Sequence, residues 1–282
     1  MALVVNSNMS ALNSLNSLNR TNHALSKTFG RISSGLRINR AGDDAAGLAV
    51  AENLDAGVRS LHAAKRNAND GIAVIQTAEG ATNEVANILK RMRELAVQSA
   101  SETLASTERQ YIETEYVQLE SEIDRISVVT EFNGVGLTRG SSANGHTGLD
   151  VQIGMYNTTD DRIEVSLGNL SAGVSGMGLT NNTITLTSAA SAQVAITQID
   201  LAIDTVNTYR STYGAIQNRL ESTVRSLDTY SENLKAAESQ IRDADFAHEA
   251  AEMSKQQIMQ QAGTAILGQA NQINQGAVRL LG

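Results

Sequence analysis

Apolar residues recur at helical spacing along most of this chain. In the first such segment they fall at Val5, Met9, Leu12, Leu15, Leu18, Leu25, Phe29, Ile32 and Leu36. When the polar Asn22 is counted as one further position of this series, the mean step is about 3.4 residues, which is typical of a coiled coil. The remaining positions are largely Asn, Ser and Thr, which are weak helix formers. The segment therefore predicts a helix that depends on packing against a partner.

A second helical pattern runs from Leu48 to Leu95 without a break and ends in a Ser/Thr-rich turn at 99–107. Its length exceeds that of an ordinary globular helix. A third pattern, from Ile112 to Ile126, predicts a helix capped by Ser106 or Thr107 and stopped by residues 131–134. These two segments predict long packed helices.

Residues 134–187 have a different pattern, with frequent glycine and alternating apolar positions. The alternation at 149–153 and at 163–167, with a turn at 157–161 between them, predicts a β-hairpin. Residues 183–187 are a candidate further strand. Helical spacing returns from Ile196 to Ile241 and continues through Met253, Ile258, Ala262, Ile266, Ala270 and Ile273 to Leu280.

The chain is thus nearly symmetric about its β-rich insert. We expect a mainly α fold in which the N- and C-terminal segments pair as a long antiparallel coiled coil or bundle. We expect residues 1–42 and 240–282 to form one domain of two arms. Residues 43–239 form a helical-rod domain that contains the short 134–187 insert. Each arm orders more backbone than its few apolar side chains can offset, so we expect the arms to be disordered until they polymerise.

Glycines and aspartates cluster where the first arm meets the second helix. This segment contains Gly35, Gly42 and Gly47, with Asp43 and Asp44 before the helix that starts near Leu48. Glycine lowers helix stability, and aspartate is a good N-cap. The cluster predicts a joint between two layers of the molecule, with Asp43 or Asp44 capping the second helix. A carboxylate pair for catalysis or a cation is the less favoured interpretation.

Composition excludes several classes of protein. The 282 residues include no proline, cysteine or tryptophan, so long helices are favoured and disulfides and thiolate chemistry are excluded. Residues 1–42 carry five basic and no acidic side chains, but Phe29 is their only aromatic residue. Nucleic-acid binding is therefore not expected. The N-terminal sequence lacks the features of a signal peptide, and no segment is apolar enough for membrane insertion.

Candidate chemistry is sparse. His248 to Glu252 resembles a helical zinc motif, but Glu252 stands where the second histidine is required. His23, His62 and His146 are isolated in sequence. We expect no catalytic residue, no metal site and no cofactor. The Ser/Thr-rich region from Thr138 to Ser191 is a candidate for O-linked glycans.

Four motifs together resemble those of bacterial flagellins. They are NSNMSALNSLN (6–16), RINRAGDDAAGLAVAE (37–52), LKRMRELAVQSAS (89–101) and SKQQIMQQAGTAILGQANQ (254–272). The resemblance covers about residues 1–140 and 188–282. It implies a flagellar filament subunit without large outer domains. In that family the terminal arms form the inner tube, and their apolar positions here include Met9, Leu12, Leu15, Leu18, Leu25, Phe29, Ile32, Ile258, Ile266, Ile273 and Leu280.

The resemblance also implies partners and a location. The main partner is the chain itself, in a helical homopolymer. Flagellins also meet a secretion chaperone, the flagellar export apparatus, and the filament cap and hook-junction proteins. They are exported to the extracellular flagellum without a cleaved signal peptide. A Toll-like receptor recognises some members through a motif that matches Arg91, Leu95 and Glu115. Two alternatives stay open: a hook–filament junction protein of the same architecture, and a non-flagellar coiled-coil scaffold.

Overall fold

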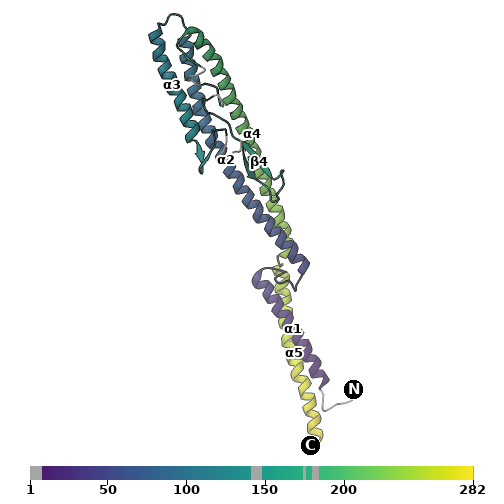
Figure 1. Cartoon of the computed structure of the whole chain (residues 1–282). Coiled ribbons are helices and arrows are strands. Elements are labelled where there is room, and N and C mark those ends of the chain that lie inside the picture. The colour runs from purple at the N-terminus through teal and green to yellow at the C-terminus, as the bar shows by residue number, and fades with distance from the viewer. Residues whose placement is uncertain (1–7, 141–147, 174–175, 180–183, 282) are drawn as a thin grey trace. The chain divides into compact units, whose positions relative to one another are not determined.

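Five helices dominate the structure, a computed structural model that describes residues 8–140, 148–173, 176–179 and 184–281, with side chains described as far as Gln272. The mainly helical fold predicted from the sequence is confirmed (Figure 1). The absence of proline allows two of the helices to exceed 50 residues. The helices are α1 (Met9–Ser34), α2 (Ala45–Ser99), α3 (Ser106–Val129), α4 (Ala189–Arg242) and α5 (Phe246–Leu281).

Contacts divide the chain into two units. The terminal unit comprises residues 1–58 and 232–282, and the central unit comprises residues 59–231. Within the terminal unit α1 and α5 run side by side (Figure 1). The predicted boundaries after residues 42 and 239 separate the arms, which are expected to need a partner chain, from the part expected to fold within one subunit. They remain a prediction.

The core of the central unit lies among α2, α3 and α4, which lie side by side (Figure 1). Leu89, Met92, Tyr116, Ile123 and Ile199 are among its fully buried members. These residues occupy the apolar positions of the predicted helices. The apolar positions of the helical patterns therefore identify the helix faces that pack in the core of this unit.

The predicted hairpin is confirmed. β3 (Gly148–Gln152) pairs antiparallel with β4 (Arg162–Ser166), whose Ile163 and Val165 are buried. Gly71 of α2 lets the hairpin approach closely, because a Cβ at that position would lie 3.1 Å from a methyl group of Val151. The hairpin therefore packs directly on α2.

The candidate strand at 183–187 is wrong for residues 184–187, while Thr183 lies outside the described residues. The polar groups of this segment bond to side chains instead of to a neighbouring strand. The Leu186 N–H donates to Glu113 of α3, and its carbonyl accepts from Ser99 Oγ at 2.7 Å. Likewise, the Ala172 N–H donates to Asp124 at 2.7 Å. Side chains of α2 and α3 thus hold the insert in an irregular conformation.

A second, shorter hairpin was not predicted. β1 (Glu131–Phe132) pairs with β2 (Val135–Gly136) across Asn133 and Gly134, whose φ angles are 50° and 76°. Two successive positive φ values define the tight turn that Asn-Gly favours between strands. The Asn133-Gly134 dipeptide could therefore have predicted this hairpin from the sequence.

The start of α3 also differs from the prediction. Its N-cap is Ala105, so that Ser106 and Thr107 already belong to the helix. No side chain caps the first amide groups of α3. Instead, the Glu108 carboxylate accepts a hydrogen bond from the Ala105 N–H at 3.0 Å. An acidic residue in the first turn thus stabilises the helix start.

Candidate assembly interface

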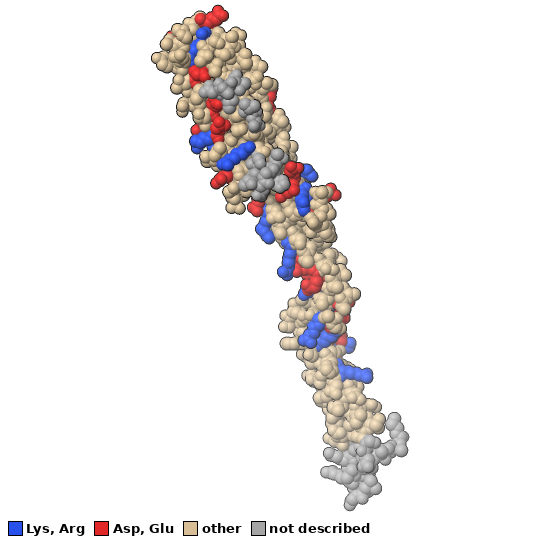
Figure 2. Space-filling view, in the orientation of Figure 1, with Lys and Arg blue, Asp and Glu red and all other residues tan. Residues whose placement is uncertain are grey.

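Large apolar side chains are exposed along both helices of the α1–α5 pair. Six of the predicted arm residues are among them, with exposed fractions from 48% at Leu15 to 65% at Phe29. On the face shown in Figure 2, the described part of this pair carries few charged side chains. We name the exposed residues the assembly set: Met9, Leu12, Leu15, Phe29, Phe246, Ile258, Met259 and Ile266.

The α1–α5 pair buries little of its own surface. Among its described residues only Thr28, Glu249 and Ala270 are buried. Leu18, Leu25 and Ile32 are half-buried. Two of the three buried residues are polar, so this pair has almost no hydrophobic core. Val5 and the side chains of Ile273 and Leu280 lie outside the described residues.

A shallow groove runs between the two helices. Its volume is about 370 Å³, and its lining includes Ser17 and Leu18 of α1 with Met259, Gly263 and Ile266 of α5. Leu18 comes within 3.3 Å of the position that a Cβ on Gly263 would occupy. Apolar atoms of both helices therefore line the same groove.

The joint, residues 35–47, is fixed by backbone contacts to the connection between α4 and α5. The Arg37 N–H donates to the Arg242 carbonyl at 2.7 Å, and the Ala244 N–H donates to the Gly35 carbonyl at 2.9 Å. Gly35 ends α1 in the left-handed conformation, with φ 71°. A residue with a side chain is strained there, which explains the glycine.

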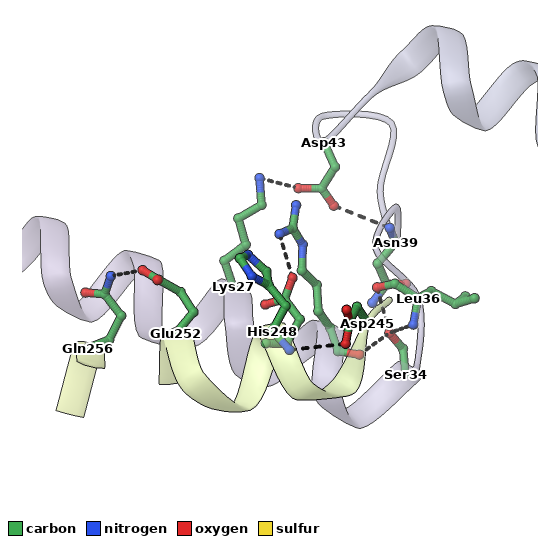
Figure 3. A network of polar contacts seen from close by, with 11 residues as sticks. Lys27, Ser34, Leu36, Asn39, Asp43, Asp245, His248, Glu252 and Gln256 are labelled. Atoms are coloured by element: carbon green, nitrogen blue, oxygen red, sulfur yellow. Dashed lines mark hydrogen bonds and ion pairs between the residues drawn. The ribbon is translucent and has the colours of Figure 1, made fainter. Parts of the chain in front are cut away.

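The two aspartates of the joint have different partners. Asp44 is the cap of α2, because its Oδ1 accepts from the Gly47 N–H at 2.9 Å. Asp43 forms an ion pair with Lys27 of α1 at 2.7 Å and also accepts from the N–H groups of Asn39 and Arg40 (Figure 3). The hydrogen bond from Lys27 is the main cause that holds the pKa of the Asp43 carboxyl below its ordinary value. The acidic pair thus fastens the joint to both neighbouring helices.

Only one of the other joint glycines is sterically constrained. A Cβ on Gly47 would lie 2.5 Å from Asp44 Oδ2 and 2.8 Å from Ile38 Cδ1, whereas nothing lies within 4 Å at Gly42. Gly47 is therefore required by the close packing of the cap and of buried Ile38. Gly42 has room for a side chain.

A cross-arm ion pair was missed by the sequence reasoning. Arg31 Nη1 of α1 lies 3.0 Å from Glu249 Oε1 of α5, and the Glu249 side chain is 6% exposed. Buried charges require a partner. The signal was present in the charges, because residues 1–42 contain no acidic residue to pair with Arg31.

The residues matching the receptor motif lie in the central unit. Arg91 Nη2 forms an ion pair with Glu115 Oε1 at 2.8 Å, and Arg91 also contacts Glu94. Both Arg91 and Glu115 are about half exposed. Leu95, in contrast, is 1% exposed and belongs to the core. Only the two charged residues therefore offer accessible side-chain atoms.

The described residues hold no group of three His, Asp or Glu side chains arranged to bind a metal ion. In the zinc-like segment, the His248 N–H donates to Asp245 at 3.2 Å, which is a helix-start contact (Figure 3). Glu252 instead bonds to Gln256 and Lys255. His146 lies outside the described residues. Within the described part of the chain, no helix combines the length and apolar character of a membrane span.

Comparisons with known proteins agree with this arrangement. The bacterial flagellin N-terminal helical region matches residues 5–143, and the bacterial flagellin C-terminal helical region matches residues 196–281. A flagellin of Halalkalibacterium halodurans is 43% identical over 279 residues, covering 99% of this chain and all of the relative. The flagellar filament 33 kDa core protein of Treponema phagedenis is 41% identical over 286 residues, with coverage of 99% and 100%.

One solved structure shows the same fold. It is a putative flagellar hook-associated protein from Vibrio parahaemolyticus, with a TM-score of 0.59 and 14% identity. The match covers 71% of this chain and all of that one. At this identity the likeness concerns the fold alone.

Long helices and a terminal pair with exposed apolar side chains characterise a mainly helical protein with an apolar surface that its own chain does not cover. Matches over both ends of the chain then identify the family. The chain belongs to the bacterial flagellin family, whose members are structural subunits of the flagellar filament. Neither the hook–filament junction protein nor the non-flagellar scaffold is favoured, because relatives about 40% identical over the full chain are flagellins and filament core proteins.

Proposed function

We propose that this chain polymerises into a flagellar filament through the assembly set of α1 and α5. The observation that carries the proposal is the exposure of eight large apolar side chains on a helix pair that buries only three residues within the described chain. The role is mechanical: the filament transmits rotation for motility. No side chain performs catalysis, and no cofactor takes part.

The free energy gained by burying the assembly set is large enough to support a contact between subunits. Full burial of a large apolar side chain stabilises by about 1.5–3 kcal/mol. Eight such side chains, each roughly half exposed, contribute on the order of 6–12 kcal/mol. Association costs about 4–15 kcal/mol in lost freedom and side-chain ordering. The assembly set therefore offsets most of that cost, and other contacts between copies set the net affinity.

The same observation supports ordering of the arms on assembly. A pair of long helices held by one buried alanine and two buried polar residues has little to offset its conformational entropy. A neighbouring copy supplies the missing apolar contacts. Residues 1–42 and 240–282 are disordered in the monomer and become helical in the polymer.

Removal of residues 1–40 tests this function. The deletion removes α1, so the shortened chain sediments as a monomer and shows no filaments in negative stain after salt-induced assembly. Its circular dichroism retains the helicity of residues 48–235, because their packing lies elsewhere. Filaments of normal length from the shortened chain would refute the role of the arms.

Family membership supports further partners. The chain is exported unfolded to the cell exterior through the flagellar export apparatus, with a secretion chaperone bound to its C-terminal arm. Cap and hook-junction proteins contact it at the filament ends. Mass spectrometry of purified filaments tests the export route, and we expect a subunit whose N-terminal sequence has lost no signal peptide.

Recognition by the flagellin-sensing Toll-like receptor is a separate proposal. The exposed Arg91–Glu115 ion pair supplies the receptor contact, while Leu95 holds α2 against the core. A receptor-reporter assay should lose its response to monomers carrying Arg91→Ala. The matched control is Arg125→Ala, which breaks the comparable exposed pair with Glu122. Equal loss in both variants would remove the case for specific recognition.

A further inference from the structure

A polar cavity lies between α1 and the joint, and no residue of the assembly set is part of its lining. Its volume is about 300 Å³. Three basic side chains line it: Lys27 and Arg31 from α1, and Arg40 from the joint. His23 lies one turn before Lys27 on the same lining, and Asp43 is the acidic residue of the lining. The cavity thus gathers cationic groups from two segments.

The acidic groups near this cavity are already engaged. Asp43 Oδ1 contacts Lys27 Nζ at 2.7 Å, and its Oδ2 accepts from the N–H groups of Asn39 and Arg40 at 3.4 and 3.3 Å. Glu249 is held by Arg31 Nη1 at 3.0 Å. Both carboxylates are committed to existing partners. The lining therefore contains more basic than acidic side chains.

Two guanidinium groups still have unused donors. Arg31 Nε is buried and makes no hydrogen bond. The Arg40 side chain has no hydrogen-bond or ion-pair partner among the described residues, since only its backbone groups are bonded. A buried donor without an acceptor costs about 1–3 kcal/mol. The unpaired guanidinium of Arg40, in a lining with further basic side chains, is suited to bind an anion.

We propose that this cavity binds one small tetrahedral oxyanion of the phosphate or sulfate type. Guanidinium groups match the geometry of such oxygens and donate to them in pairs. The cavity has room for the ion with some of its water. Arg40 supplies the free donors, while Arg31 and Lys27 add positive potential to the lining.

The bound ion would connect the last turns of α1 to the joint. Arg31 belongs to α1 and Arg40 to the joint, so an oxyanion shared by both ties the segments together beyond the Lys27–Asp43 ion pair. A ligand that binds only the ordered state stabilises that state. Phosphate or sulfate would therefore strengthen the ordered arm in a way that chloride at equal ionic strength does not.

Assembled filaments are the form in which to test the site, because the arms are proposed to be ordered there; in this respect the test rests on the proposed function. Filaments are sedimented with ³²P-labelled phosphate at constant ionic strength set by sodium chloride. We expect saturable binding of one phosphate per subunit, competed by sulfate and not by chloride.

Arg40→Gln should weaken binding by about tenfold or more, because it removes the free charged donors, and Arg40→Lys should recover part of it. The matched control is Arg20→Gln, which removes the same charge from α1 outside the cavity and should bind like the wild type. Filaments that bind no phosphate, or bind it equally with Arg40→Gln, would overturn the site. If no filaments form, the proposed function fails instead. Equilibrium dialysis of the unassembled chain then decides the site, and the absence of Arg40-dependent binding overturns it.

Discussion

Truncating one exposed apolar side chain should raise the critical concentration for polymerisation by a calculable factor. Ile266 on α5 is 58% exposed. Full burial of an isoleucine stabilises by about 1.5–3 kcal/mol, so burying the remaining surface between copies contributes about 0.9–1.7 kcal/mol. At 0.59 kcal/mol for RT, Ile266→Ala should raise the critical concentration by up to about 4- to 20-fold.

The assay is sedimentation of seeded filaments at a series of total concentrations, with the soluble fraction taken as the critical concentration. Gln257→Ala is the matched control, because it places alanine at an exposed polar position of the same helix, outside the groove that Ile266 lines. We expect its critical concentration to stay near the wild-type value. An unchanged critical concentration for Ile266→Ala would show that this residue stays in water in the polymer.

Three further predictions concern the joint and the core. Gly47→Ala should destabilise the joint and alter filament shape, because its Cβ meets Asp44 and Ile38, whereas Gly42→Ala should leave filaments unchanged under electron microscopy; equal behaviour would contradict the steric account. Leu89→Ala should lower the free energy of unfolding in urea by about 2–5 kcal/mol, and a loss below about 1 kcal/mol would contradict its core role. Asp43→Asn should lower the free energy of unfolding of the filament subunit near pH 6 by at most about 1 kcal/mol. Because the pKa of Asp43 is lowered in the folded state, the wild-type advantage is present above its ordinary value of 3.8 and disappears as pH falls through the lower folded value; an advantage that persists in acid would contradict the ion pair.

The helices could be predicted because their signal is local and repeated. In α2 and α4 an apolar residue returns about every 3.5 positions with no proline to interrupt it, and the structure gives helices of 55 and 54 residues. The strand proposed at 183–187 failed for the opposite reason. Leu186 bonds to Glu113, which lies 73 residues away, and no local pattern encodes such a contact.

The site could be predicted only in part. Periodicity shows that Leu12 and Leu18 are both suited to burial, but it does not show what buries them. Leu18 packs towards Gly263 of the same chain, whereas Leu12 remains 55% exposed. The same limit applies to the charges, since the pairing of Arg31 with Glu249 joins residues 218 positions apart. These contacts depend on the paired arms and are visible only in three dimensions.

Hydrogen exchange of the α1 and α5 amides, measured in the monomer and in the filament, tests the central claim most directly. We predict fast exchange across both helices in the monomer and strong protection in the filament. The α2 and α4 amides of the central core should be protected in both states, since their buried contacts lie within one chain. Equal protection of α1 and α5 in the two states would contradict assembly through these helices.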